Sequence, residues 1–123
     1  MHEMGLAQGI LEIALEASRG EKVRRIDLIV GRGQMVKTDS LEFSFRLIAA
    51  GTLAANANFT MKEIPIRVRC NRCRAERETD LPPFNCRECG ASEVEIISGD
   101  EFLVDAVELE SGRVIARQDT ADS

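Results

Sequence analysis

The sequence is short of several features, and each shortage excludes a class of protein. No apolar stretch approaches the roughly 20 residues that span a bilayer, and the first residues lack the basic-then-apolar pattern of a signal peptide. Neither sign of charge forms a long run: sixteen Lys and Arg stand against twenty-one Asp and Glu, for a net charge of −5. The sequence therefore predicts a cytoplasmic chain with no membrane insertion and no overall attraction to nucleic acid.

Histidine is nearly absent, since His2 is the only one among 123 residues. A chain of this length forms one compact domain or two small units that share a core. Folding at this size buries roughly 60–70% of the unfolded chain's surface, so a small appended module would need a further source of stability. The four cysteines are candidates for that source.

Apolar residues at helical spacing predict two helices. The first runs from about residue 4 to Gly20, and the second continues to Gly51 with Leu41, Phe45 and Ile48 at positions i, i+4 and i+7. Segments of period two follow each helix, which indicates a fold that contains both helices and strands.

Asp39 and Ser40 stand where the second helix should begin. Glu42 follows three residues after Asp39, which is the spacing of a capping box. We therefore interpret Asp39 and Ser40 as helix-cap residues rather than as ligands.

Alternating apolar residues predict three strands of one small sheet, near residues 23–31, 58–66 and 101–109. The first strand ends in a flexible turn at Gly31-Arg32-Gly33. In the second strand, the alternation of apolar and polar residues changes register near residues 62–65, so either a bulge or a domain boundary lies there. Pro65 also favours the edge of a sheet. The last strand is too apolar to stand alone, and we expect it to return to the sheet.

The segment between the second and third strands has a different character. It contains all four cysteines, has no helical period and is interrupted by Pro82-Pro83. The predicted fold class is α+β: a mixed or antiparallel three-stranded sheet with two helices, and an inserted zinc-ribbon-like hairpin module. The expected organisation is a domain of residues 1–66 completed by 98–110, a module of residues 67–97, and a disordered tail of residues 111–123.

The four cysteines form two closely spaced pairs. Two residues separate Cys70 from Cys73 and Cys86 from Cys89, and twelve residues lie between the pairs. This spacing lets each tight turn present two sulfurs to one ion, and four thiolates suit tetrahedral zinc with no open position for a catalytic water. Disulfides within each pair and a rubredoxin-like iron centre remain as alternatives, which metal content and the visible spectrum would separate.

Arginines near the cysteines raise a second interpretation, a zinc ribbon that binds nucleic acid or protein. Those arginines are Arg67, Arg69, Arg72, Arg74, Arg77 and Arg87. Acidic neighbours offset most of their charge, and Phe84 is the only aromatic residue in the module that could stack on a base. We favour a structural staple that folds around its metal, and keep the ribbon as the alternative.

His2 lies next to the chain's amine, and this position has its own chemistry. The α-amine of Met1, the backbone nitrogen of His2 and its imidazole Nδ1 can close two fused chelate rings around one cation. Glu3 or another group could supply a fourth ligand, in the planar arrangement that Ni(II) or Cu(II) accepts. A histidine near a chain end is also often a solvated side chain, and composition does not decide between the two.

Three features together resemble the HypA family of hydrogenase maturation nickel metallochaperones. They are Met1-His2-Glu3 opening an amphipathic helix, the two cysteine pairs, and the segment EIISGDEFLVDAVELE at residues 95–110. The similarity covers about residues 1–110. Arg74 and Arg87 depart from the family pattern, because glycine and proline are common at those positions, but neither change removes a donor atom.

The resemblance implies a function for each metal. His2 would be the principal nickel ligand, assisted by Met1 and Glu3, and Cys70, Cys73, Cys86 and Cys89 would hold a structural zinc. Ni(II) would be cargo, passed on with the help of a HypB-type nickel-handling GTPase to the hydrogenase large subunit, with urease accessory proteins as further partners in some organisms.

An enzyme is the least favoured class. A second histidine is lacking, cysteines committed to a metal cannot serve as nucleophiles, and Gly31-Arg32-Gly33 lacks the following glycine or lysine of a phosphate loop. The sequence therefore predicts a metal-delivery protein with no catalytic residues, no bound organic cofactor and no nucleic-acid partner.

Overall fold

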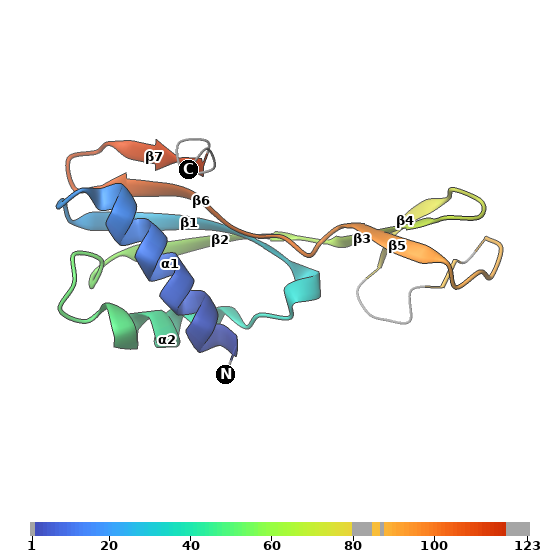
Figure 1. Cartoon of the computed structure of the whole chain (residues 1–123), viewed down its shortest axis with the longest axis horizontal. Helices are drawn as coiled ribbons and strands as arrows, with labels where there is room; N and C mark the ends of the chain where they lie inside the picture. Colours follow the sequence, from blue (N-terminus) through green and yellow to red (C-terminus); the bar gives the residue numbers. More distant parts are fainter. Residues whose placement is uncertain (1, 80–84, 87, 118–123) are drawn as a thin grey trace. The chain divides into compact units, whose positions relative to one another are not determined.

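The structure is a computed structural model that describes residues 2–79, 85, 86 and 88–117. Among them, the elements are α1 (His2–Ser18), β1 (Val23–Gly31), a short 3-10 helix (Arg32–Gln34), α2 (Thr38–Ala49), β2 (Asn58–Ile64), β3 (Ile66–Cys70), β4 (Glu76–Thr79), β5 (Val94–Ser98), β6 (Phe102–Leu109) and β7 (Val114–Ala116) (Figure 1). The α+β class is confirmed, because the described residues form two α-helices and two sheets.

The chain divides into two compact units. Unit 1 is formed by Met1–Ile29, Val36–Lys62 and Leu103–Ser123, and unit 2 by Val30–Met35 and Glu63–Phe102. The division after Lys62 falls at the shift of apolar phase in the sequence, just before Pro65 separates β2 from β3.

A four-stranded sheet in the order β2-β1-β6-β7 carries the core of unit 1. From Ile26 to Val30 every second residue of β1 is buried, as the alternating pattern requires. Buried apolar residues of the core are Ala7, Ile10, Ala14, Ile26, Leu28, Leu41, Phe45, Val107 and Leu109. The rings of Phe45 and Phe59 lie with centroids 4.6 Å apart and planes tilted by 54°, which joins α2 to β2.

The sheet of unit 2 is antiparallel, with the order β4-β3-β5. Its central strand β3 turns Ile66, Val68 and Cys70 to a buried face. A bulge interrupts the pairing with β5 between Arg67 and Val68. The second half of the unit is poor in apolar side chains, because the cluster around the cysteines consists of Cys70, Cys86 and Ala91 with Ala75 and Val94 packed on it.

The backbone at Gly31 and Gly33 packs closely against the backbone of residues 99–101, instead of forming the flexible turn expected from the sequence. The N–H of Gly31 donates to the carbonyl of Glu101 at 2.7 Å, and the N–H of Gly33 donates to that of Gly99 at 2.6 Å. A Cβ on Gly31 would lie 2.1 Å from the carbonyl carbon of Gly99, so no other residue fits. Gly99 has φ +102°, a conformation that favours glycine.

The predicted cap of the second helix is wrong. Lys37 occupies the N-cap position and makes no side-chain cap hydrogen bond, while α2 begins at Thr38. Asp39 lies inside the first helical turn, where a carboxylate interacts favourably with the helix dipole. The capping-box spacing therefore identified the helix start within two residues but assigned the wrong residue to the cap.

The C-terminal segment also differs from expectation. Residues 114–116 form β7, which pairs with β6 through Ala106 and Ala116, Val107 and Ile115, and Glu108 and Val114. A tight turn at Gly112, with φ +94°, reverses the chain between the two strands. The sheet thus has a fourth strand beyond the three predicted. The sequence did not predict this strand because a polar hairpin gives little signal in the pattern of apolar residues. Residues 118–123 lie outside the described residues.

None of the helices within the described residues has the length and apolar character needed to cross a bilayer.

An ion-pair network stabilises the exposed face of the first sheet. Arg25 donates from Nε to Asp27 Oδ1 at 2.8 Å and from Nη1 to Glu108, and the Thr60 hydroxyl donates to Asp27 Oδ1 at 2.6 Å. Burial alone would raise the pKa of Asp27, but the hydrogen bonds from Arg25 and Thr60 outweigh it and lower that pKa. The charged form of Asp27 is therefore favoured by folding.

Replacing Asp27 with Asn should change how stability depends on pH. Because the folded-state pKa is lowered, the carboxylate's contribution is present above its ordinary value near 4 and is lost as pH falls below it. We expect Asp27→Asn to lower the free energy of unfolding by on the order of 1 kcal/mol at pH 6 and by much less at pH 3. Urea unfolding followed by helical circular dichroism measures this; an equal difference at both pH values would contradict it.

Candidate metal centre

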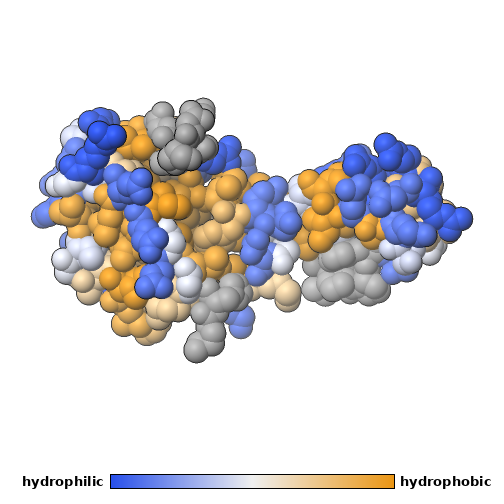
Figure 2. All heavy atoms as spheres, in the orientation of Figure 1, coloured by the Kyte–Doolittle hydropathy of each residue, from blue (hydrophilic) through white to orange (hydrophobic). Residues whose placement is uncertain are grey.

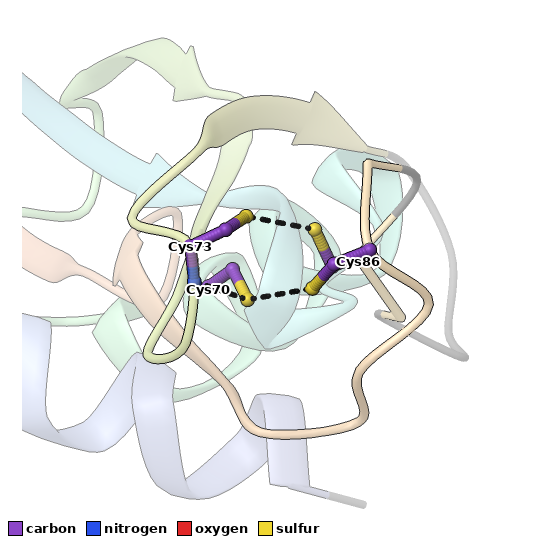
Figure 3. Close-up of side chains that lie close together, drawn as sticks. Cys70, Cys73 and Cys86 are labelled. Atoms are coloured by element: carbon purple, nitrogen blue, oxygen red, sulfur yellow. Dashed lines mark hydrogen bonds between the residues drawn. The ribbon is translucent and has the colours of Figure 1, made fainter.

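The four cysteine sulfurs come together in unit 2. Cys70 ends β3 and Cys73 lies in the turn that follows, while Cys86 and Cys89 lie in a second turn before β5. The Sγ atoms of Cys70 and Cys89 are 3.6 Å apart and those of Cys73 and Cys86 are 3.5 Å apart, as the dashed lines of Figure 3 show for the clustered side chains. All four lie within 4.8 Å of one another, so one ion can reach every sulfur.

The spacing of these sulfurs matches a tetrahedral metal site. With metal–sulfur bonds of about 2.3 Å, a tetrahedron of thiolates has sulfur–sulfur edges of about 3.8 Å. The closest contacts join one turn to the other, and the cysteines form no disulfide. Pairing within each turn, one of the alternatives, is therefore not what the structure contains. The donor set fits a four-coordinate thiolate-bound ion, and no fifth side chain is needed to complete it.

The two cysteine turns are built alike. The N–H of Arg74 donates to the carbonyl of Cys70, and the N–H of Gly90 donates to that of Cys86, each at 2.9 Å. Both donors adopt the left-handed conformation, with φ 68° at Arg74 and φ 76° at Gly90. Gly90 adopts it without cost, whereas a side chain at Arg74 is strained there. The departure of Arg74 from the family pattern thus falls on a position that glycine would suit better.

Backbone donors favour the thiolate form at the first cysteine of each turn. The N–H of Cys73 donates to the sulfur of Cys70 at 3.4 Å, as does that of Arg72, and these bonds lower the pKa of Cys70 to about 6. The N–H of Cys89 lowers the pKa of Cys86 in the same way. The pKa values of Cys73 and Cys89 are instead raised, because each shares a hydrogen bond with a sulfur of the other turn and because burial disfavours its charge. One thiolate in each turn is therefore favoured before any cation binds, and a cation held by all four sulfurs would displace the remaining protons.

Charge around the cysteines is largely paired within the sheet. Arg67 and Arg69 both reach Glu76, at 3.2 Å and 4.0 Å, and Arg69 also pairs with Glu95 at 3.2 Å. These ion pairs neutralise Arg67 and Arg69, two of the arginines on which a nucleic-acid ribbon would depend. Arg72 and Arg74 are exposed, so the basic surface at this end is small within the described residues.

The N-terminal candidates belong to the other unit. α1 begins at His2, but the side chain of His2 and all of Met1 lie outside the described residues, as does Arg87 near the cysteines. Glu3 is half-buried in the first turn of α1. It lines a hollow beside the start of the chain, together with Met4, Asp39, Ser40, Phe43 and Ser44.

Sequence reasoning missed this hollow. The sequence predicts a cap role for Asp39 and Ser40, and Phe43 lies outside the repeat of Leu41, Phe45 and Ile48. A signal was present, since Phe43 and Leu47 are four residues apart and form a second apolar line on α2.

Relieving the strain at Arg74 should stabilise unit 2. We expect Arg74→Gly to raise the free energy of unfolding of the zinc-loaded protein by about 0.5–1 kcal/mol, and Gly90→Ala to lower it by about 1 kcal/mol. Arg72→Gly, in the same turn but without a positive φ, is the control and should destabilise. Urea unfolding of the three variants measures the changes, and stabilisation by Arg72→Gly equal to that by Arg74→Gly would contradict the strain argument.

Comparison with known proteins identifies the family. The family model described as "Hydrogenase/urease nickel incorporation, metallochaperone, hypA" matches residues 1–109. The chain is 37% identical over 122 residues to the hydrogenase maturation factor HypA of Streptomyces avermitilis, covering 95% of this chain and 93% of the relative. It is 34% identical over 110 residues to that of Nostoc punctiforme, covering 89% and 96%.

Solved structures agree on the fold. The solution structure of the nickel metallochaperone HypA from Helicobacter pylori superposes with a TM-score of 0.62 at 14% identity, covering 87% of this chain and 96% of that one. With a family match over nearly the whole described chain and relatives above 30% identity, the resemblance is confirmed. The chain belongs to the HypA family of nickel metallochaperones, which act in hydrogenase maturation.

Proposed function

We propose that this protein binds Ni(II) at its N-terminus and delivers it to the large subunit of [NiFe]-hydrogenase, while its four cysteines hold a structural zinc. One observation carries the proposal: the chain's only histidine is its second residue, at the start of α1, in a family match that begins at residue 1. The amine, the His2 backbone nitrogen and the imidazole form a three-nitrogen chelator.

The geometry of the cysteine cluster supports zinc as its ion. Four thiolates at the edge length of a zinc–sulfur tetrahedron close the coordination shell, so a bound zinc would serve structure and not catalysis. The small apolar cluster around Cys70 and Cys86 supports the same role, because a module with few buried side chains gains its folding energy from metal binding. We infer a cytoplasmic location, which the four free cysteines support because thiols stay reduced in that compartment.

The N-terminal chelate suits an ion that must be passed on. A site at a chain end can exchange its ligands one at a time with those of a partner, whereas a closed four-thiolate site holds its ion tightly. Met1 and Glu3 are the neighbouring donors that would complete the sphere around His2. Copper(II) should bind this site at least as tightly as nickel in vitro, so selectivity depends on partners and metal supply.

The proposed partners follow from this delivery role. A HypB-type nickel-handling GTPase would exchange nickel with this protein, and the hydrogenase large subunit would receive it. Urease accessory proteins are a second route, which the description of the family model supports by naming hydrogenase and urease together. The zinc-ribbon alternative finds no support in the paired charges of the three-stranded sheet.

Removing zinc should unfold unit 2 and leave unit 1 folded. Unit 1 has its own apolar core around Phe45 and Ile26, whereas the cysteine end of unit 2 has only small buried side chains. After treatment with a strong chelator, we expect amide protons of residues 66–70 and 94–98 to lose protection while those of 26–28 keep it. Hydrogen exchange measures this, and uniform loss of protection in both units would contradict it.

Nickel binding should depend on His2 and on pH. Untagged, zinc-loaded protein should bind about one Ni(II) and His2→Ala none, with zinc unchanged in both. Because the amine and imidazole must lose protons to bind, with ordinary pKa values of about 7.8 and 6.5, affinity should fall steadily between about pH 7.5 and 6. Calorimetric titration measures both effects. Equal nickel binding by the variant, or flat affinity across this range, would refute the chelate.

A further inference from the structure

The four sulfurs of the cysteine cluster differ in exposure. Cys70 and Cys86, the first cysteines of the two turns, are 1% and 6% exposed, whereas Cys73 and Cys89, the second cysteines, are exposed. In Figure 2, hydrophilic residues cover much of the end of unit 2 that carries β4 and β5 in Figure 1, so this end faces water. A small reagent in solution therefore reaches one sulfur of each turn more readily than the other.

The sulfurs also differ in the backbone N–H groups that reach them. Two donate to each buried sulfur: those of Arg72 and Cys73 to Cys70, each at 3.4 Å, and the equivalent pair of the second turn to Cys86. Within the described residues, one backbone N–H donates to the sulfur of Cys73 and one to that of Cys89. Because each donor withdraws electron density from a thiolate, the two exposed sulfurs are also the more nucleophilic.

The close sulfur contacts join one turn to the other. Each exposed sulfur lies against the buried sulfur of the opposite turn: Cys73 is 3.5 Å from Cys86, and Cys89 is 3.6 Å from Cys70. Figure 3 marks these contacts between the facing side chains. To form a disulfide bond of about 2.05 Å, these sulfurs need to approach by only about 1.5 Å. Each exposed sulfur thus has a partner for a disulfide in the opposite turn.

We propose that the cysteine cluster is a thiol oxidation site for hydroperoxides, which react first at the exposed sulfurs and leave disulfides that join the two turns. The pairs formed are Cys73–Cys86 and Cys70–Cys89. This inference rests on the proposed function, because the sulfurs that react are those proposed to hold zinc. The disulfides then replace the metal as the link between the turns.

The reaction balances with the hydroperoxide as the only oxidant. The thiolate of Cys73 attacks an oxygen of hydrogen peroxide, the O–O bond breaks, and a sulfenic acid forms with release of hydroxide. The thiolate of Cys86 then attacks that sulfur and displaces a second hydroxide, which leaves the disulfide. Cys89 and Cys70 react in the same way. Four thiolates, two molecules of hydrogen peroxide and four protons thus give two disulfides and four waters, and the cluster, without its thiolates, releases a bound zinc.

Trypsin separates all four cysteines, which makes their pairing measurable. Cleavage after the arginines places them in four peptides: 70–72, 73–74, 78–87 and 88–113. Zinc-loaded, full-length protein is treated with hydrogen peroxide, alkylated, digested and analysed by mass spectrometry. We expect peptide 73–74 joined to 78–87 and peptide 70–72 joined to 88–113. Pairing within each turn would instead join 70–72 to 73–74 and 78–87 to 88–113, and would overturn the proposal.

The unfolded protein is the matched control, since it has the same sequence without the cluster. In urea, with zinc removed, closing the short loop within a turn costs less entropy than closing the longer loops, so pairs within each turn should predominate. The same pairing in the folded and unfolded protein would contradict the claim that the folded cluster directs the reaction.

A second arm identifies the sulfurs that react first. Folded protein is treated with less than one equivalent of hydrogen peroxide in the presence of dimedone, which traps sulfenic acids. Labels should fall on Cys73 and Cys89 at least about fivefold more often than on Cys70 and Cys86, because oxidation follows exposure and thiolate character. Labelling that favours the buried pair, or that is equal on all four, overturns the proposal.

Hydrogen exchange tests whether the disulfides replace the metal. Amide protons of residues 66–70 should keep their protection after oxidation and lose it in reduced protein treated with a chelator. Loss of protection after oxidation would show that the turns are no longer linked and would overturn this part of the proposal.

Zinc content keeps this inference separate from the proposed function. A chromogenic indicator should record about one zinc released for every two molecules of hydrogen peroxide consumed, and a thiol reductant with added zinc should restore the site. Full retention of zinc in excess peroxide overturns the proposal. Absence of zinc before treatment overturns only the proposed structural zinc, and the pairing of the peptides then decides the oxidation site.

Discussion

The clustering of the four cysteine sulfurs is the constraint that holds the two cysteine turns of unit 2 together. Apart from Ile66 and Val68, this unit buries little that could hold its cysteine turns in place, and the apolar cluster there is made of small side chains. Backbone N–H groups already turn toward the sulfurs of Cys70 and Cys86, and the two turns repeat the same hydrogen bond. A single cation can therefore connect two turns that lie 13 to 19 residues apart in sequence.

The two units carry the two proposed metal sites, which differ in kind. In unit 2 the donors are fixed by strand ends and tight turns, a geometry that retains an ion. In unit 1 the proposed donors His2 and Glu3 lie in the first turn of α1, before its buried positions Ala7, Ile10 and Ala14, so a change of ligands there would leave the core in place. The exposed side chains of Phe43 and Leu47 give the same unit a surface that folding does not use.

Features set by local periodicity or by ligand spacing could be predicted from the sequence. The strand at 23–31 and the grouping of the cysteines are of this kind, because alternation and two-residue spacing leave few alternatives. Features set by tertiary contact could not. β7 exists because β6 offers an edge, Lys37 replaces Asp39 at the cap, and Gly31 is required by a carbonyl of distant Gly99. The hollow at Phe43 is lined by residues of both α1 and α2, so it could be identified only once the packing of the two helices was known.

The measurement that tests the account most directly is X-ray absorption at the nickel and zinc edges of the same doubly loaded, untagged protein. The account predicts four sulfur neighbours at about 2.3 Å around zinc and only nitrogen and oxygen neighbours around nickel. Sulfur in the first shell of nickel, or nitrogen in that of zinc, would contradict the assignment of one metal to the cysteines and the other to the N-terminus.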